Sequence, residues 1–315
     1  MNDSSAATLL DTGLYDSLSG AVDQVAGVVV GKREQIKLAF ACVLADGHLL
    51  IEDLPGVGKT TLAHALALTL GMGFQRIQFT SDLLPADILG VSIYNRDSHG
   101  FEFHPGPVFS EVLLADEVNR ATPKTQSALL EAMAERQVTV DGQTHMLPEP
   151  FFVIATQNPM DMAGTFPLPD SQLDRFLMRL SLGYPDAGAE RELLAGEDRK
   201  TMLSGLPARI TGDEIKALQA AVRHVHASEA LLDYLQALVA HTRQSGLFTS
   251  GLSPRAALAL LRCARSWALI QGRDYCLPED LQLLFPALAG HRLNPAGRND
   301  TAGAIEEVLG AVAIP

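Results

Sequence analysis

Residues 49–68 read LLIEDLPGVGKTTLAHALAL: a short apolar run, a glycine-rich turn and then a run with helical character. This order is the context of the phosphate-binding pattern G-x-x-x-x-G-K-[ST], in which a strand leads through a glycine-rich loop into a helix. Gly56, Gly58 and Lys59 fit the pattern, whereas Asp53 stands at the position of its first glycine. Because Asp53 falls at the predicted strand end, before the phosphate cradle, we expect its carboxylate to point away from a bound phosphate.

The glycine-rich loop predicts a site for a nucleotide and a metal ion. Its backbone N–H groups and the positive end of the following helix both favour a phosphate. The Lys59 ammonium is expected to reach the β- and γ-phosphates, and the Thr60 hydroxyl is expected to bind Mg²⁺. The loop residues expected to bind the nucleotide are Pro55, Gly56, Val57, Gly58, Lys59, Thr60 and Thr61.

Other short apolar runs predict further buried strands, with helical stretches between some of them. Strands that alternate with helices indicate an α/β layer structure with a mainly parallel sheet. The predicted strands are 48–52, 74–79, 111–115, 151–157 and 176–182, and the clearest helices are 32–46, 59–70 and 123–135.

Two segments alternate apolar and polar residues around a polar turn and predict β-hairpins. They are residues 91–106 and residues 136–147, and the second has the turn pair Asp141-Gly142 at its centre. An Asp-Gly pair between alternating residues is a strong hairpin signal because both positions favour positive φ.

The pattern changes after Gly183, where strand-like runs end. Residues 186–315 predict helices only, and the predicted helix starts are at Thr211, Ser228, Ser253-Pro254 and Leu277-Pro278. We therefore predict an α/β domain over 1–185 and an all-helical domain over 186–315. The small, polar residues 1–15 are predicted to form a loose end.

Charge and composition limit the classes of partner. The chain has 37 acidic and 24 basic residues, and residues 1–185 carry 22 acidic side chains against 11 basic ones. A protein that neutralises many phosphates usually has a basic face, so bulk nucleic-acid binding is disfavoured. Three scattered cysteines fit neither a disulfide framework nor a zinc site. With no apparent signal peptide or transmembrane segment, we expect a cytoplasmic protein.

Two adjacent carboxylates follow the predicted strand at 111–115. Asp116 and Glu117 stand at its carboxyl end, the edge where open α/β sheets bind ligands. Asp116 is expected to support the Mg²⁺ shell, and Glu117 to orient and polarise an attacking water. The strand at 151–157 also ends in polar residues, and the Asn158 amide there can hold a water or a γ-phosphate oxygen.

Two arginines are candidate anion ligands. Arg255 follows Ser253 and Pro254 at the predicted start of a helix, where a cation opposes the helix dipole. We therefore expect Arg255 to bind an anion. Arg175 ends a short predicted helix, where a cation is favourable without any ligand.

In this order, the motifs resemble those of AAA+ ATPases, and more narrowly those of the MoxR family. The narrower likeness lies in EDLPGVGKT, HPGPVF, PDSQLDRF and above all ADEVNRATPKTQSALLEAMAERQVTVDG, and it extends over about residues 20–295. MoxR-like loops commonly carry aspartate where Asp53 stands. The AAA+ motifs along the chain are Walker A (55–61), Walker B (113–121), sensor 1 (154–159), LDRF (173–176) and SPRA (253–256).

The resemblance implies an AAA+ P-loop domain with a central parallel sheet, followed by an all-α lid. The hairpins at 91–106 and 136–147 would be the helix-2 insertion and the pre-sensor-1 hairpin. Subunits of this family form rings, usually hexamers, with ATP at each interface.

The resemblance also implies roles for single residues. Val30 and Gly31 match the segment near adenine, Asn158 matches sensor 1, and Arg255 matches sensor 2. Arg175 matches the arginine finger that reaches the nucleotide of a neighbouring subunit. Which arginine acts across the interface stays open, because relatives with these insertions rearrange the lid.

The function expected from this resemblance is Mg²⁺-dependent ATP hydrolysis by a ring that remodels or matures partner proteins, often ones with von Willebrand A domains. A magnesium-chelatase-like ATPase subunit shares both hairpins and is an alternative. A nucleic-acid-directed motor or transcription activator is disfavoured by the acidic charge balance. A nucleotide-gated scaffold without hydrolysis is disfavoured by the presence of Glu117.

Overall fold

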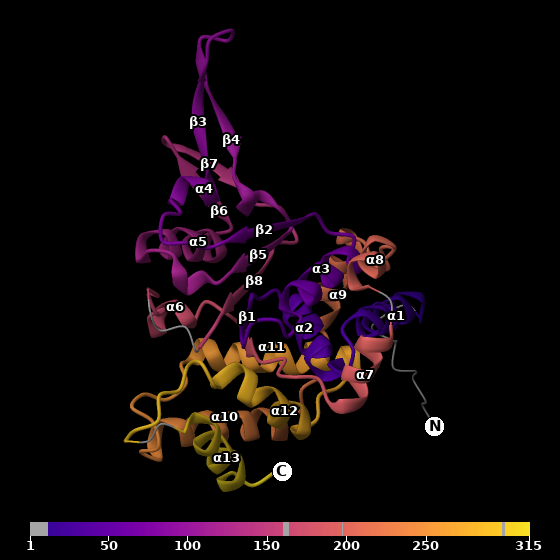
Figure 1. Ribbon diagram of the computed structural model, residues 1–315. Coiled ribbons are helices and arrows are strands. Elements are labelled where there is room, and N and C mark those ends of the chain that lie inside the picture. The colour runs from indigo at the N-terminus through magenta and orange to yellow at the C-terminus, as the bar shows by residue number, and fades with distance from the viewer. Residues whose placement is uncertain (1–11, 160–163, 197, 298–299) are drawn as a thin grey trace.

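The computed structural model describes residues 12–159, 164–196, 198–297 and 300–315 (Figure 1). Strands and helices are interspersed up to β9, and the named elements after β9 are all helices. This order agrees with the change of pattern predicted after Gly183.

Five parallel strands form the central sheet, in the order β2–β5–β8–β1–β9. Each strand corresponds to one of the predicted apolar runs. The strands are β1 (Leu49–Glu52), β2 (Phe74–Gln78), β5 (Val112–Asp116), β8 (Phe152–Gln157) and β9 (Met178–Leu180). Because the strands are parallel, their carboxyl ends share one edge, and the residues that follow them are brought together there.

Successive residues of the central strands face two different apolar cores. On β5, Val112 and Leu114 belong to one core, while Leu113 and Ala115 belong to the other. This alternation is the two-residue period of a strand, here in a sheet that is covered on both faces. The helices contributing to the first core include α1 (Thr12–Val28), α2 (Arg33–Leu44) and α3 (Lys59–Thr69), and α5 (Pro123–Glu135) contributes to the second.

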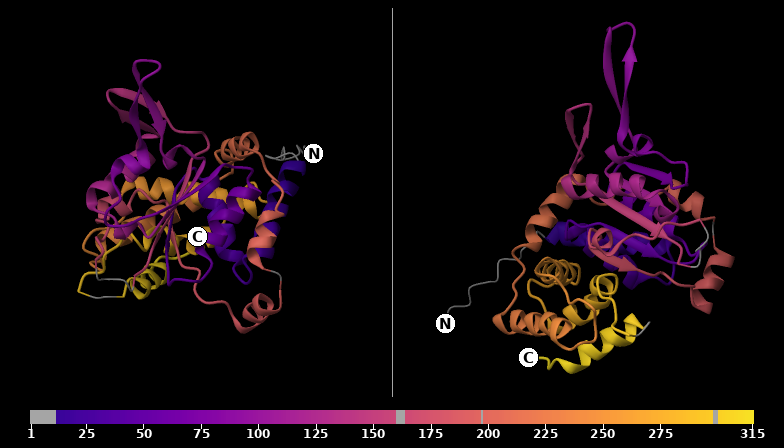
Figure 2. Two further views of the ribbon diagram at one scale, coloured as in Figure 1. Left: turned by 45° about the horizontal axis from the view of Figure 1, so that its top comes forward. Right: turned by 90° about the vertical axis from the view of Figure 1, so that its left-hand side faces the viewer.

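Both predicted hairpins are confirmed, and they extend from the body of the protein beyond β2 and α5 (Figures 1 and 2). Asp141 and Gly142 turn the second hairpin with φ angles of 51° and 78°. Phe103 of the first hairpin stacks on His145 of the second, with ring centroids 4.0 Å apart, so the two hairpins contact each other. The strands are β3 (Gly90–Asn95), β4 (Gly100–Pro105), β6 (Gln137–Val140) and β7 (Gln143–Met146).

The helical part begins with α7, and the four helix starts predicted within it are confirmed. Thr211 and Glu214 form the predicted capping box, and the Ser228 and Ser253 side chains accept backbone hydrogen bonds. The helices of this part are α7 (Ala187–Ala195), α8 (Arg199–Ser204), α9 (Gly212–Val222), α10 (Glu229–Gln244), α11 (Pro254–Ile270), α12 (Pro278–Ala289) and α13 (Thr301–Ala311). Short helices elsewhere are α4 (Pro85–Leu89), η1 (Pro107–Phe109), η2 (Val118–Arg120) and α6 (Asp170–Leu173).

Helix α1 is the main departure from the predicted elements. Residues 1–11 of the predicted loose end lie outside the described residues, but the prediction is wrong for residues 12–15, which begin α1. Leu18 and Val25 of this helix are fully buried, and Tyr15 packs against the same core. The buried face packs against α2, which is next along the chain, and against the more distant α3 and α11.

One apolar core runs through both predicted domains. It contains Leu49 of β1, Leu260 of α11 and Val308 of α13. The central parallel sheet and helical C-terminal part predicted from the sequence are confirmed, with the two parts sharing a core. The predicted boundary near residue 185 falls between β9 and α7 and stays a prediction.

The three cysteines are unpaired and buried. Burial raises the pKa of Cys42 well above its ordinary value and raises those of Cys263 and Cys276 to about 12. No helix in the described part of the chain is long and apolar enough to cross a membrane.

Candidate functional site

The predicted phosphate loop has an open geometry that depends on glycine. Gly56 and Gly58 have φ angles of 83° and 96°, and no atom lies within 4 Å of where a Cβ would stand on either. Helix α3 begins at Lys59, so its first backbone N–H groups face the loop. The Lys59 ammonium donates to the backbone oxygen of Asp53 at 2.7 Å, and Thr60 is exposed. The loop has the shape and donors of a phosphate cradle.

Asp53 points away from this cradle, as predicted. Its carboxylate accepts hydrogen bonds from the backbone N–H groups of Leu54, Leu182 and Gly183 and from the Ser181 hydroxyl. Burial raises the pKa of Asp53, but these hydrogen bonds outweigh burial and hold its pKa below the ordinary value. The carboxylate therefore fastens the loop to the segment after β9.

The acidic pair lies at the same edge of the sheet as the phosphate loop. Asp116 ends β5, and Glu117 adopts the left-handed conformation, with φ of 56°. The buried Thr156 hydroxyl donates to Asp116 at 2.5 Å and accepts from the Glu117 backbone N–H at 2.9 Å. Burial lowers the pKa of Lys59, while the nearby carboxylates of Asp53, Asp116 and Glu117 act in the opposite direction. The structure thus brings Lys59 and the acidic pair together.

Two side chains of β2 contact the acidic pair and were missed in the sequence. Arg76 forms an ion pair with Asp116, and Gln78 donates a hydrogen bond to Glu117. Arg76 and Gln78 are two residues apart, so they share one face of the strand. In the sequence, the signal that could have revealed these residues is a pair of polar side chains on one face of a predicted strand, close to its carboxyl end.

Asn158 follows β8 at the same edge. It lines a cavity of about 340 Å³ together with Glu52, which ends β1, and Asn119, which follows the acidic pair. Gln157 is paired with Glu52 in the sheet register and donates a hydrogen bond to it. The polar side chains that end β1, β5 and β8 therefore lie at one edge, as the sequence predicts.

Val30 and Gly31 lie in the turn between α1 and α2. The position of a Cβ on Gly31 is only 2.7 Å from the Cβ of Ala189 in α7, so a larger side chain would have to displace that helix. The next residue, Lys32, donates to the backbone oxygen of Tyr184 at 2.8 Å. Because Asp53 binds Gly183, the turn and the phosphate loop both contact the segment between β9 and α7.

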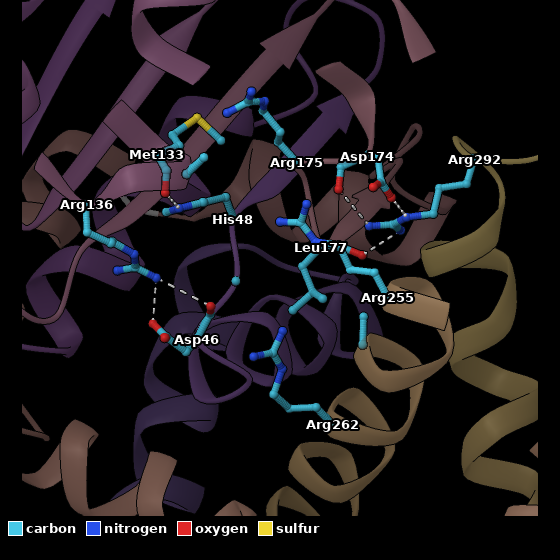
Figure 3. A pocket seen from close by; sticks show the side chains of 13 residues that line it. Asp46, His48, Met133, Arg136, Asp174, Arg175, Leu177, Arg255, Arg262 and Arg292 are labelled. Atoms are coloured by element: carbon cyan, nitrogen blue, oxygen red, sulfur yellow. Dashed lines mark hydrogen bonds and ion pairs between the residues drawn. The ribbon is translucent and has the colours of Figure 1, made fainter. Parts of the chain in front are cut away.

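Arg175 and Arg255 lie together in a different cavity, of about 210 Å³ (Figure 3). Arg136 pairs with Asp46 and Arg292 pairs with Asp174 in its lining. The guanidinium of Arg175 donates to a backbone oxygen, and Arg255 makes no hydrogen bond or ion pair with the described residues. The cationic side chains of this arginine pocket are Arg136, Arg175, Arg255, Arg262 and Arg292.

The arginine pocket and the phosphate loop lie at opposite edges of the sheet. Gly47 and His48, which line the pocket, precede β1, whereas the loop follows it. The four residues of β1 alone span about 13 Å. The expected nucleotide ligands are therefore divided: Lys59, Asp116, Glu117 and Asn158 share one edge, and Arg175 and Arg255 are at the other. Neither arginine faces the phosphate loop of its own chain.

The oxygen donors near the loop suit Mg²⁺. The Thr60 hydroxyl and the Asp116 carboxylate are hard ligands, and Mg²⁺ in phosphate-transfer sites typically takes one or two protein ligands beside phosphate and water. No group of three or more His, Cys, Asp or Glu side chains placed to hold a metal occurs in the described residues. The donors present fit a metal that arrives with a phosphate.

Comparison with known proteins agrees with this geometry. The family model for the ATPase family associated with various cellular activities (AAA) matches residues 48–178, and the AAA lid domain matches residues 240–309. A crystal structure of a candidate ATPase from Cytophaga hutchinsonii superposes with a TM-score of 0.86 at 37% identity, covering 96% of both chains. A strand–loop–helix phosphate cradle, an acidic pair and a helical lid define an AAA+ protein.

The curated relatives narrow this class. The protein YeaC of Bacillus subtilis is 45% identical, covering 96% of both chains. Chaperone MoxR1 of Mycobacterium tuberculosis is 41% identical, covering 88% of this chain and 75% of the relative. Protein MoxR of Methylorubrum extorquens is 32% identical, covering 92% of this chain and 91% of the relative. The chain belongs to the MoxR family of AAA+ ATPases.

Proposed function

We propose that this protein is a Mg²⁺-dependent ATPase that works as a homo-oligomeric ring on a protein client. The observation that carries the proposal is the meeting of Lys59, Asp116 and Glu117 at the edge of the sheet where the open glycine cradle lies. A cradle alone would bind phosphate. A second carboxylate beside the one that supports a metal adds the group needed to orient a water molecule.

The chemistry is direct attack of water on the γ-phosphate. Bound Mg²⁺, held by Thr60 and Asp116, would neutralise phosphate charge. Lys59 binds the β- and γ-phosphates, Glu117 orients and polarises the water, and Asn158 holds the water or a γ-phosphate oxygen. The other loop residues supply backbone N–H groups, and Val30 and Gly31 lie against the base. Catalysis then rests on positioning and charge neutralisation, without a covalent intermediate.

Arg175 and Arg255 complete the site from a neighbouring subunit. They lie at the edge of the sheet opposite the phosphate loop, in a cationic pocket of a protein whose net charge is −13. A head-to-tail ring would bring this pocket against the phosphate edge of the next subunit. We propose that both arginines act across this interface, and that the ring is a hexamer as in related AAA+ proteins.

The client assignment rests on the relatives. One relative is named a chaperone, and by analogy we propose chaperone-like remodelling or maturation of a protein, with von Willebrand A domain proteins as the first class to test. A magnesium-chelatase-like role remains the alternative with the same hairpins. The acidic charge balance disfavours a nucleic-acid-directed motor, and tight, salt-sensitive DNA binding at low salt would contradict that view.

The test separates nucleotide binding from turnover. Lys59→Ala should lose ATP binding, because the cradle loses the ammonium that neutralises the phosphates. Glu117→Gln should keep ATP binding, with turnover falling by about 100-fold or more because the water is no longer oriented. Binding is measured by calorimetry and turnover by phosphate release.

The matched control is Glu131→Gln, which makes the same change on an exposed position of α5. It should leave turnover unchanged. Full ATP affinity in Lys59→Ala, or normal turnover in Glu117→Gln, would remove the corresponding assignment.

A further inference from the structure

Arg76 lies beside the acidic pair and takes no part in the proposed hydrolysis. It is on β2, one of the two edge strands of the sheet, and its side chain is 48% exposed. Its Nε and Nη2 atoms donate to the same oxygen of Asp116, at 3.1 and 2.7 Å. The two N–H groups thus share one carboxylate oxygen in a charge-assisted pair.

Both oxygens of Asp116 are therefore engaged. Oδ2 accepts from Arg76, and Oδ1 accepts from the Thr156 hydroxyl at 2.5 Å. The Arg76 guanidinium neutralises the charge of a carboxylate that is nearly buried. A metal ion that approaches Asp116 therefore meets a carboxylate that already forms an ion pair with Arg76.

Arg76 also reaches Glu117 indirectly. Its Nη2 atom donates to the Gln78 side-chain oxygen at 3.1 Å, and the Gln78 amide nitrogen donates to Glu117 at 2.8 Å. The amide of Gln78 is oriented by this arrangement, because its oxygen faces the guanidinium and its nitrogen faces the carboxylate. Arg76 therefore contacts Asp116 directly and Glu117 only through Gln78, whereas Arg120 forms a direct ion pair with Glu117 at 2.9 Å.

We propose that Arg76 is a positioning residue for Asp116: it balances the charge of that carboxylate when no metal is bound. The inference rests on the proposed function, since it concerns the same site. Its consequence is that Arg76 weakens the coupling between Mg²⁺ and nucleotide.

The first experiment measures metal coupling without hydrolysis. The dissociation constant of a fluorescent ADP analogue is measured for the full chain in EDTA and in saturating Mg²⁺, and the ratio of the two reports the coupling. In Arg76→Ala this ratio should rise by about tenfold, because a cation a few ångströms from Asp116 no longer opposes the metal. Any general change in nucleotide affinity cancels in the ratio.

The matched control is Arg96→Ala, which removes the same unit of charge from an exposed position in the turn between β3 and β4. Its ratio should equal that of the wild type. In an Asp116→Asn background, the Arg76→Ala change should alter the ratio by much less than in the wild type, because the charged carboxylate that holds Arg76 beside the metal site is gone.

The second experiment uses Arg76→Lys, which keeps the charge but replaces the guanidinium. Its metal-coupling ratio should stay near that of the wild type, because the lysine charge still balances the Asp116 carboxylate. This variant also guards against misfolding of Arg76→Ala, and circular dichroism checks both.

An unchanged coupling ratio in folded Arg76→Ala would overturn the proposal, as would equal ratios in Arg76→Ala and Arg76→Lys when both differ from the wild type. A wild-type protein with no Mg²⁺-dependent nucleotide binding would instead overturn the proposed function, and this inference with it.

Discussion

Asp53 occupies the first position of the glycine-rich loop, yet its carboxylate binds the backbone of a different segment. Three N–H groups and one hydroxyl donate to it, and the residue is 6% exposed. The sequence predicts that Asp53 points away from the phosphates, because the strand ends there. It does not predict the acceptor role, since Leu182 and Gly183 lie about 130 residues further along the chain.

Asp53→Ala should lower the free energy of unfolding by about 3 kcal/mol, because buried N–H groups lose their acceptor. Asp53→Asn keeps one acceptor oxygen and should lose about half as much. Chemical denaturation at pH 7.5 measures both. A change below about 0.5 kcal/mol in Asp53→Ala would contradict the fastening role described for this carboxylate.

Elements with a local signal were predicted well. Strands β1, β5 and β8 are apolar runs with sharp polar ends, and helix α5 begins and ends at the predicted residues, Pro123 and Glu135. Helix α1 was missed in part because it contains three glycines, which lower helix propensity, while its stability comes from tertiary packing against α2, α3 and α11.

The candidate site also contains parts that the sequence predicts and parts that depend on tertiary packing. Its phosphate loop and acidic pair follow from residues close together along the chain, so the sequence predicts them. Arg255 was placed correctly at the start of α11, with Ser253 as its cap. The packing of α11 on α2 decides at which edge of the sheet Arg255 lies. No spacing in the sequence carries that information.

Two buried histidines make the elements around the arginine pocket sensitive to acid. His48 accepts from the Val153 backbone N–H, and its other ring nitrogen faces the Met133 backbone oxygen; His291 faces the Phe176 backbone oxygen. Burial lowers the pKa of both histidines from 6.5 to about 3. Both rings therefore stay neutral in the folded protein at moderately acidic pH.

The free energy of unfolding should fall as pH drops below 6.5. In the unfolded state both histidines bind a proton below this pH, whereas in the folded state they do so only near pH 3. Between pH 6 and 5 the loss should be about 2 kcal/mol for the pair. His291→Gln should remove about half of this slope, and exposed His224→Gln should leave it unchanged. Denaturation curves across this range are the measurement; a flat profile would be inconsistent with neutral buried rings.

At the scale of the whole molecule, the chain carries the two halves of the proposed catalytic site at separate edges of the sheet. The phosphate edge holds Lys59 and Glu117, and the opposite edge holds Arg175 and Arg255. A sheet with proposed nucleotide-binding residues at both edges is suited to head-to-tail assembly. Each interface would then join the phosphate edge of one subunit to the arginine pocket of the next. Turnover should therefore depend on protein concentration at low subunit concentrations.

Mixing variants tests this arrangement. Arg175→Ala and Glu117→Gln proteins should each be nearly inactive, but an equal mixture should recover about a quarter of wild-type turnover, since a quarter of randomly formed interfaces combine both intact halves. Arg255→Ala mixed with Glu117→Gln should behave alike. Phosphate release from mixed assemblies, verified by mass photometry, is the measurement.

The control mixture is Lys59→Ala with Glu117→Gln. Both residues belong to the same half, so no interface in that mixture is intact and turnover should not recover. Inactive Arg175→Ala mixtures, with mixed assemblies shown to form, would place that arginine outside the shared site.

The burial of all three cysteines makes this protein convenient for optical measurements. Their raised pKa values and their positions leave them poorly reactive toward maleimide dyes in the folded state. A cysteine introduced at Ser98, in the exposed turn between β3 and β4, would then take a dye selectively with the native thiols left in place. In the proposed ring, energy transfer between such dyes on neighbouring subunits would report movement of the projecting hairpins when ATP is added.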